Sequence, residues 1–312
     1  MSDNRTLLLD SAAALFDDLA GVDANAAWPR FAAAGFASLL VAEDQGGFGG
    51  NWADFFAVMR LAGETTLSLP IGETILATRL LADAGLDTPQ GWLTIAASLD
   101  AVPFGRAVKA VVIADGQTLS LFSGASVADA AATGDPLDAV QGDVMASADS
   151  SADTMQLGAF LRVAQSAGAL DRALRMAMEY TAQRVQFGKT LSQQQAVQQS
   201  LAILAVETAV VDVAGQGAAA ALDRGEAVFE IAAAKLRTNM AIGTGTSIAH
   251  QVHGAIGFTL EYDLHRYTRR LMGWRSEFGN DRFWAERTGA FALKAGGSGL
   301  WGALTVRTDK AA

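Results

Sequence analysis

The stretch RVQFGKTLSQQQAVQQSLA runs from Arg184 to Ala202 and joins two long segments with helical patterns. An arginine at the end of a helix can clamp a phosphate with two hydrogen bonds, and an aromatic ring a few residues later can cover a purine. Taken alone, the stretch is more simply explained as a joint between two helices that carries a surface salt bridge. Its meaning depends on the rest of the chain.

A second stretch, QVHGAIGFTLEYDLHRYTRR, runs from Gln251 to Arg270. A glycine-containing loop between two helices lets backbone amides approach an anion, although a plain turn is the simpler explanation. The histidines of the chain are His250, His253 and His265, and no carboxylate stands beside them at a recognised metal-ligand spacing. We therefore predict helix-end packing or hydrogen-bonding roles for them, and no metal site.

The residues from Met155 onward predict four amphipathic helices, which indicate a bundle. The expected buried stripe of the first helix is Phe160, Val163, Ala167, Leu170, Leu174 and Met178, and the polar positions off that stripe are Arg162, Gln165, Arg172, Arg175 and Glu179. Ser192 to Gln195 has the form of a capping box that opens the second helix. The third runs from Glu226 to about His250, and the fourth carries Leu264, Tyr267, Leu271 and Trp274 on one face.

The remainder of the chain divides into a helical and a β-rich part. Helices are expected near the N-terminus, with examples at 55–61 and 75–86, and a glycine-rich loop at 46–50 lacks the spacing of a dinucleotide fingerprint because Trp52 stands where a third glycine is needed. Short β-prone runs separated by turn signals lie between Gly91 and Asp153. We predict a mainly α fold with an N-terminal helical domain (1–90), a small β-rich middle domain (91–153) and a C-terminal helical bundle (154–312).

Composition excludes several classes of function. The 312 residues carry a formal net charge of −10, which opposes binding to nucleic acid or to an anionic membrane surface, and an anionic substrate would need a local basic site. The chain has no cysteine, which fits a reducing compartment. Its start has no secretion-signal pattern, and no run of about 18 apolar residues predicts a membrane span. We expect a cytoplasmic protein.

Taken together, in this order and separation, the two stretches closely resemble the acyl-CoA dehydrogenase family. That family has an Arg-x-x-Phe-Gly segment followed by a glutamine that opens a long helix, and a glutamine-glycine turn two helices later. The matching residues here are Arg184, Phe187, Gly188 and Gln195, then Gln251, Gly254, Gly257, Phe258, Thr259 and Glu261. Residues 41–49 also resemble a glycine-rich segment near the family's N-terminus.

The resemblance implies FAD as cofactor, an acyl-CoA thioester as substrate and an electron-accepting flavoprotein as redox partner. In the family a glutamate removes the α-proton while the β-hydrogen leaves as hydride to the flavin, and the FAD lies across a subunit interface. Carried over, Arg184 and Gln251 would meet the pyrophosphate, Phe187 would pack near the adenosine portion, and Gly254 would allow backbone approach. Gln195 belongs to the same set of cofactor-contact residues.

The chain departs from the family pattern in three places. The middle segment is short and lacks the family's flavin-cradling segments. The family's C-terminal base position holds Phe278, with Glu277 adjacent as a weak candidate, and the other known base position falls near Gly158, with no acid within a turn. The doublet Gly254-Ala255 has alanine where the family has a second glycine, which is tolerated unless the backbone there needs a positive φ.

These departures remove the flavin-cradling half and the base, and leave the half that reaches over a neighbour's FAD. The resemblance is therefore to the shortened subunits of heteromeric α2β2 members found in bacterial steroid side-chain degradation. We predict a hetero-oligomer in which a full-length partner supplies the flavin contacts and the catalytic glutamate. The alternatives are a self-sufficient homo-oligomer with Glu277 or another acid as base, and a non-redox structural or hydratase-like protein. The sequence does not specify the acyl group.

Overall fold

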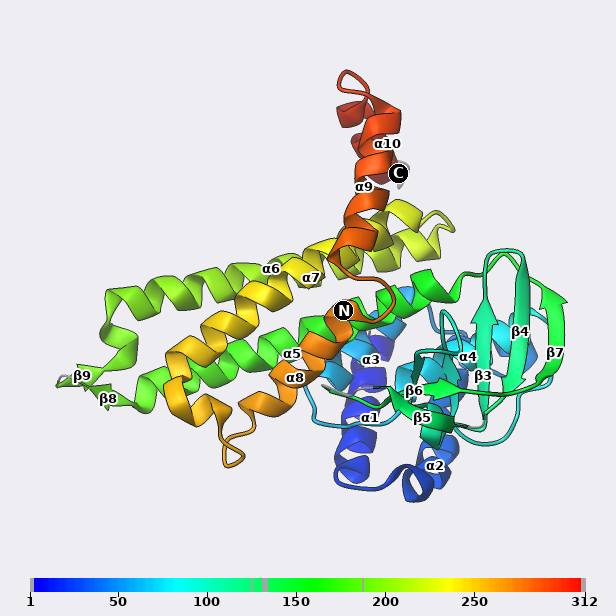
Figure 1. Ribbon diagram of the computed structural model, residues 1–312, viewed down its shortest axis with the longest axis horizontal. Helices are drawn as coiled ribbons and strands as arrows, with labels where there is room; N and C mark the ends of the chain where they lie inside the picture. Colours follow the sequence, from blue (N-terminus) through cyan, green and yellow to red (C-terminus); the bar gives the residue numbers. More distant parts are fainter. Residues whose placement is uncertain (1–2, 125, 131–133, 187, 310–312) are drawn as a thin grey trace.

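The computed structural model describes residues 3–124, 126–130, 134–186 and 188–309. Figure 1 shows a largely helical body, a small β region at one side, and a helical arm that rises away from the rest of the molecule. The buried apolar side chains form one cluster that extends from the first helix into the C-terminal helices. The mainly α fold class is confirmed, whereas the division into three domains stays a prediction.

The N-terminal part consists of α1 (Asp3–Leu19), α2 (Ala24–Ala33), α3 (Trp52–Gly63) and α4 (Ile71–Asp83), with the short helical turns η1 (Phe36–Ser38) and η2 (Glu43–Gln45) between α2 and α3. Asn51 and Asp54 form a reciprocal capping box that starts α3. The glycine-rich loop doubles back on the preceding chain, since a Cβ on Gly47 would lie 2.2 Å from the Val41 carbonyl oxygen. Its role here is a close backbone turn between helices, as expected.

The β region contains two small sheets. One has the strand order β1-β3-β4-β7, made of β1 (Leu93–Ile95), β3 (Ala110–Ala114), β4 (Thr118–Ser123) and β7 (Val144–Asp149). The other has the order β2-β6-β5, made of β2 (Val102–Pro103), β6 (Leu137–Val140) and β5 (Ser126–Ala130), with η3 (Gly105–Ala107) after β2. Thr74 of α4 donates to the Leu93 carbonyl at 2.8 Å, which ties the helical part to the edge of the first sheet.

The C-terminal bundle is formed by α5 (Thr154–Gln183), α6 (Gln195–Asp223), α7 (Val228–His253) and α8 (Leu264–Ser276). Between α5 and α6 lie β8 (Val185–Gln186), β9 (Lys189–Thr190) and η4 (Leu191–Gln193), and η5 (Gly254–Phe258) follows α7. The arm in Figure 1 is α9 (Asp281–Ala295) and α10 (Leu300–Asp309). Phe291 of α9 packs on Phe229 of α7 with ring centroids 4.1 Å apart, which fixes the base of the arm.

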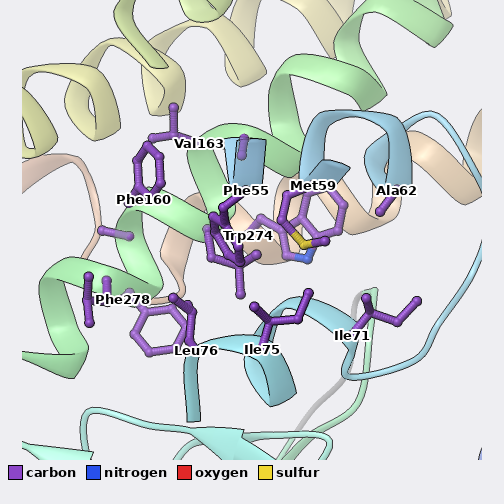
Figure 2. Close-up of a cluster of buried hydrophobic side chains, with 14 of the residues drawn as sticks. Phe55, Met59, Ala62, Ile71, Ile75, Leu76, Phe160, Val163, Trp274 and Phe278 are labelled. Carbon is purple, nitrogen blue, oxygen red and sulfur yellow. The ribbon is translucent and has the colours of Figure 1, made fainter. Parts of the chain in front are cut away.

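The core of the molecule lies where α3, α4, α5 and α8 meet. Figure 2 shows Trp274 of α8 among Phe55 and Met59 of α3 and Ile75 of α4. The Trp274 ring is fully buried, and its indole N–H donates to Asp135 Oδ2 at 3.1 Å. This core holds α8 against α3 and α4. It therefore fixes the position of the residues that follow α8.

The structure corrects two details predicted from the sequence. Arg162 and Gln165 are buried rather than on a polar face of α5, because helices surround α5 on several sides, whereas Met178 is 53% exposed. The capping box at Ser192 does not form: α6 begins at Gln195 after a separate helical turn, and the Ser192 hydroxyl lies 3.0 Å from that of Thr190. Within the described residues, α6 also proves long and apolar enough to cross a membrane, by length and composition alone.

Candidate functional site

The first sequence stretch forms a small hairpin at one end of the bundle. Arg184 caps α5, with its N–H donating to the Tyr180 carbonyl at 2.9 Å, and its own carbonyl accepts from Leu191 N–H at 2.9 Å. Gly188 has a φ of +77° in the turn between β8 and β9, which favours glycine there. Phe187, the expected adenosine contact, lies outside the described residues. The hairpin leaves the Arg184 side chain exposed at the end of α5.

The second stretch ends α7 at the same end of the bundle. Gly254 terminates the helix with φ +64° and ψ −143°, a conformation that an L-residue rarely adopts. Of the described non-glycine residues, Phe104 and Phe278 have positive φ, so Ala255 does not. Alanine at position 255 is therefore compatible with the backbone conformation, although the family has a second glycine there.

A cavity of about 300 Å³ brings the two stretches together. Gln186 and Leu191 line it from the hairpin side, and Gln251 and Gly254 line it from the end of α7. Its wall includes Tyr180 and His253, whose rings stack with centroids 4.8 Å apart. Segments 60 residues apart in sequence thus meet in one concave site of the size of a small-molecule pocket.

Arg184 and Gln195 lie near this cavity without lining it, among the residues that the structure describes. Gln195 is exposed at the first position of α6, and the exposed Arg184 and Gln251 side chains make no hydrogen bond with another described residue. Tyr180 and Leu191 were not predicted from the sequence. Tyr180 lies one helical turn before Arg184, and that spacing could have placed it at the same end of α5.

A groove of about 930 Å³ continues from the cavity between α7 and α8, sharing Gln251 and Gly254 with it. Its basic lining residues are His250, His265, Arg269 and Arg275, and none of its described lining residues is acidic. The exposed Phe258 ring stacks on His250 with centroids 4.3 Å apart. In a chain with a net charge of −10, this groove gathers basic side chains that could meet an anionic ligand, although Arg275 is also paired with Asp281 at 2.8 Å.

The histidines have the hydrogen-bonding roles that the sequence predicted. His253 Nδ1 lies 2.7 Å from the Ala249 carbonyl, and His250 Nε2 lies 2.9 Å from Thr268 Oγ1. Burial lowers the pKa of both imidazoles, which favours the neutral form. Among the residues that the structure describes, no group of three or more potential ligands could hold a metal ion.

Phe278 and Gly158, which the resemblance places at or near the family's two positions for the catalytic base, lie in contact with each other. The Phe278 ring packs directly on Gly158 of α5, so that a Cβ on Gly158 would lie 2.3 Å from ring carbons. Phe278 has a φ of +50°, and its carbonyl accepts from the buried Trp284 indole N–H at 2.9 Å. An apolar ring therefore packs directly on a glycine of α5 at these positions.

Glu277 is paired with the buried Arg162 and also lines a small cavity beside Phe278. Arg162 Nε donates to Glu277 Oε2 at 2.8 Å, Arg162 Nη2 lies 2.7 Å from the same oxygen as an ion pair, and Arg162 Nη1 pairs with Glu73 at 2.7 Å. Burial raises the pKa of Glu73, whereas Arg162, although buried, has a raised pKa because two carboxylates face it. The adjacent cavity at Phe278 is about 210 Å³, below the roughly 300 Å³ of ordinary ligand pockets.

This network was not apparent from the sequence, where Arg162 was assigned to a polar face. The i, i+3 pair Arg162 and Gln165 is bonded at 2.6 Å within α5, but Glu73 and Glu277 come from distant parts of the chain. The Glu277 carboxylate is paired with Arg162 through Oε2, and its assignment as a weak candidate for the base stays a prediction.

The comparisons with known proteins agree with this geometry. Residues 149–286 match the model of the family described as acyl-CoA dehydrogenase, C-terminal domain. The chain is 31% identical over 254 residues to acyl-CoA dehydrogenase IpdE2 of Mycobacterium tuberculosis, with 77% of each chain covered. It is 28% identical to IpdE2 of Mycolicibacterium smegmatis over 296 residues, which cover 88% of this chain and 94% of that relative.

Solved structures share the fold over nearly the whole chain. The ChsE4-ChsE5 complex from Mycobacterium tuberculosis contains a chain with a TM-score of 0.78 and 20% identity, covering 93% of this chain and 97% of that one. Tcur3481-Tcur3483, described as a steroid ACAD, gives a TM-score of 0.79 at 20% identity, with 92% and 97% covered. At this identity the likeness establishes the fold.

Proposed function

Because this chain belongs to the acyl-CoA dehydrogenase family, we propose that it is one subunit of a heteromeric FAD-dependent acyl-CoA dehydrogenase. In this arrangement it donates contacts to the pyrophosphate and adenine half of an FAD whose flavin half rests on a full-length partner. The proposal rests on a contrast within the chain. The stretches assigned to cofactor contact converge on a cavity, whereas the positions assigned to the catalytic base hold Phe278 and Gly158.

The residues at the end of the bundle fit the chemistry of FAD, the family's cofactor. A pyrophosphate needs amide and cationic donors, and the end of α7 offers the Gln251 amide next to a basic groove without acidic residues among those described. The positive φ of Gly254 turns the chain sharply after α7, and no atom lies where a Cβ would. Arg184 stands exposed at the adjacent helix end, within reach of a ligand that extends beyond the cavity.

When bound, FAD supplies the acceptor for the hydride that leaves the β-carbon of the acyl thioester. This chain's contribution is binding and orientation, and the partner contributes the carboxylate that removes the α-proton. The committed ion pair of Glu277 argues against the self-sufficient alternative. An electron-accepting flavoprotein completes the proposed cycle.

The substrate and the compartment follow as further parts of the proposal. We expect an acyl-CoA with a bulky, ring-containing acyl chain, by likeness to the structure described as a steroid ACAD. The absence of cysteine from the sequence fits the reducing cytoplasm.

The test is FAD binding by the complex co-purified with a full-length relative. Arg184→Ala should raise the Kd for FAD by about 10- to 100-fold, the effect of losing one charge-assisted hydrogen bond. The matched control is Arg30→Ala, a similarly exposed arginine on α2 that pairs with Asp18. An unchanged Kd in the Arg184 variant would remove the proposed cross-subunit role.

The chain purified alone distinguishes the alternatives. The proposal expects a colourless protein without dye-reducing activity toward acyl-CoA. A yellow protein that reduces a dye with acyl-CoA would establish the self-sufficient enzyme. A complex that never retains FAD would favour the non-redox alternative.

A further inference from the structure

The histidines of the chain all lie around the groove and the cavity at the end of α7. His250 and His265 line the groove between α7 and α8, and His253 lines the adjoining cavity. The sequence has no other histidine. Imidazole is the side chain that most readily gains a positive charge near neutral pH. The concave surface assigned to the cofactor therefore contains every imidazole in the chain.

Two of the histidines have their ring nitrogens turned into the protein. A carbonyl can only accept, so His253 Nδ1, which lies 2.7 Å from the Ala249 carbonyl, carries the proton. Its Nε2 then accepts from the Tyr262 hydroxyl at 3.2 Å. His250 Nε2 lies 2.9 Å from Thr268 Oγ1, and His250 Nδ1 is buried without a partner among the described residues. Burial lowers the pKa of both rings, which keeps them uncharged.

His265 has a different arrangement, in which one nitrogen is left for a second proton. Its Nδ1 lies 3.0 Å from the Tyr262 carbonyl and so donates to it, which leaves Nε2 as the atom that a second proton would occupy. The His265 side chain is half-buried in the wall of the groove, and Arg269 lines the same groove one helical turn further along α8. A protonated His265 and the permanently charged Arg269 therefore share one face of α8.

The other two basic residues that line the groove contribute less positive charge. Arg275 is paired with Asp281 at 2.8 Å, and His250 stays uncharged because burial lowers its pKa. The positive charge of the groove is therefore concentrated at His265 and Arg269.

Three acidic residues lie around the segment from Tyr262 to His265, and all three are exposed. They are Glu179 on α5, Glu261 in the loop before α8, and Asp263 at the start of α8. Glu179 pairs with Arg172 at 3.9 Å, and Asp263 pairs with Arg266 at 3.5 Å. None of the three acidic residues lines the groove, so an anion there meets no carboxylate among the described lining residues.

We propose that His265 and Arg269 bind a phosphate-type oxyanion in the groove, and that protonation of His265 makes this binding stronger as the pH falls. Imidazolium and guanidinium groups both form charge-assisted hydrogen bonds with such an anion. A proton that is taken up together with the anion links the affinity to pH. Neither residue is among the cofactor contacts that the resemblance assigns.

The identity of the oxyanion rests on the proposed function. Gln251 lines both the groove and the cavity, so a ligand held at Gln251 extends from the assigned cofactor contacts toward His265. The oxyanion that reaches this place is then the pyrophosphate of FAD. The binding of an oxyanion by His265 and Arg269 can be tested without FAD.

The first test uses the full chain alone with inorganic sulfate, whose charge does not change near neutral pH. The proton NMR spectrum should contain three histidine Cε1 signals, because the chain has three histidines. At about pH 6.5 sulfate should shift the signal that His265→Gln removes, whereas sodium chloride of equal ionic strength should not. The glutamine amide can still donate to the Tyr262 carbonyl, so this variant keeps the local hydrogen bond. If sulfate shifts no histidine signal, or only those of His250 and His253, the proposal is wrong.

The second test measures the Kd for FAD in the complex with a full-length partner at about pH 8 and at about pH 6. The pyrophosphate of FAD is a diester, so its own charge stays constant over this range. The wild-type affinity should rise by about 5- to 10-fold toward the lower pH, the gain from one charge-assisted hydrogen bond. His265→Lys carries a fixed charge and should bind equally at both pH values. A rise in His265→Gln as large as that in the wild type would overturn the proposal.

A matched control and one comparison separate this inference from the proposed function. His250→Gln removes another imidazole of the groove, one that burial keeps uncharged, so the rise in affinity toward lower pH should remain. If Arg184→Ala weakens FAD binding but the wild-type Kd does not change with pH, the proposed function stands and the role of His265 fails. If the complex retains no FAD while sulfate still shifts the His265 signal, the oxyanion site stands and the proposed function fails.

Discussion

At the scale of single residues, Phe278 is a bulky side chain held by its neighbours in an unusual backbone conformation. Its ring covers Gly158, its carbonyl accepts from Trp284, and its φ of +50° is a conformation that bulky residues rarely adopt. Backbone strain of this kind persists only where the surroundings over-determine it. The residue that stands at the family's base position is therefore fixed by packing on both sides.

The contact between Phe278 and Gly158 leads to a stability prediction. Gly158→Ala should destabilise the chain by about 1–3 kcal/mol despite the better helix propensity of alanine, because its Cβ would overlap the Phe278 ring. Urea unfolding measures the change. Adding Phe278→Leu should recover part of the loss, since the two sites share one space.

A matched glycine provides the control. Gly289 lies inside α9, and nothing lies within 4 Å of the Cβ that alanine would add. Gly289→Ala should stabilise the chain by about 0.5–1 kcal/mol. If both substitutions stabilise equally, the ring does not pack on Gly158 in solution.

The residue scale also marks the limit of the sequence. Sequence position alone assigned Phe278 and Gly158 to the two base positions and found no acid at either. Their mutual contact and the burial of Arg162 depend on how α5 and the segment after α8 approach each other. A long-range approach of this kind leaves no periodicity in a single sequence, whereas the cofactor-contact residues sit in short stretches whose pattern is local.

At the scale of elements, α8 is held at its C-terminal end by a buried lysine from α7. Lys235 Nζ donates to the carbonyls of Trp274 and Arg275 at 2.9 and 3.3 Å, and to Asn239 Oδ1 at 2.7 Å. A cation at this end of a helix satisfies carbonyls that lack a partner in the helix. Lys235 therefore helps to fix the exit of α8, from which the Glu277 segment and the arm continue.

Burial lowers the pKa of Lys235 to about 7, which makes the cap sensitive to pH. The unfolded lysine has a pKa of about 10.4, so the unfolded chain binds more protons between these values and stability rises with pH. The unfolding free energy of the wild type minus that of Lys235→Met should rise by about 1.4 kcal/mol per pH unit over this window. Urea unfolding at several pH values measures it.

The control is an exposed lysine on the arm. Lys294→Met should leave the pH dependence of unfolding unchanged, because the Lys294 side chain stands in solvent on α9. The contrary outcome is a Lys235→Met variant with the same pH dependence of unfolding as the wild type. That result would contradict a buried Lys235 without a carboxylate partner, and with it the cap at the end of α8.

The helices were largely predictable from the sequence, and the predictions that were wrong have physical reasons. Long helices with few prolines produce strong periodicity, so α5 begins next to the predicted Met155, and α7 begins and ends within a few residues of the predicted limits. The start of α6 was predicted from a capping box that η4 replaces, because local backbone bonds already satisfy the chain there. The exposed apolar side chains of α6, such as Val206 and Val213, were not predicted, because apolar periodicity does not distinguish a buried helix face from an exposed one.

At the scale of the whole molecule, the resemblance to the family predicted a fold that the structure and the relatives confirm. The functional proposal rests on the positions where the chain departs from the family pattern. The C-terminal bundle, which carries the cofactor-contact stretches, coincides with the family match over residues 149–286. The middle segment keeps two small sheets between residues 93 and 149. The proposed arrangement of two unlike subunits expects one half of a shared site in this chain and the other half in its partner.

That division predicts the cofactor content of the complex. If each site needs one copy of this chain and one partner, the complex should contain one FAD for every pair of polypeptides. The measurement is flavin absorbance after denaturation, set against protein determined by amino-acid analysis. One FAD per polypeptide would mean that this chain also cradles a flavin, which the packing of Phe278 on Gly158 and the small neighbouring cavity oppose. Because the count does not depend on the acyl group, it tests the shared site by itself.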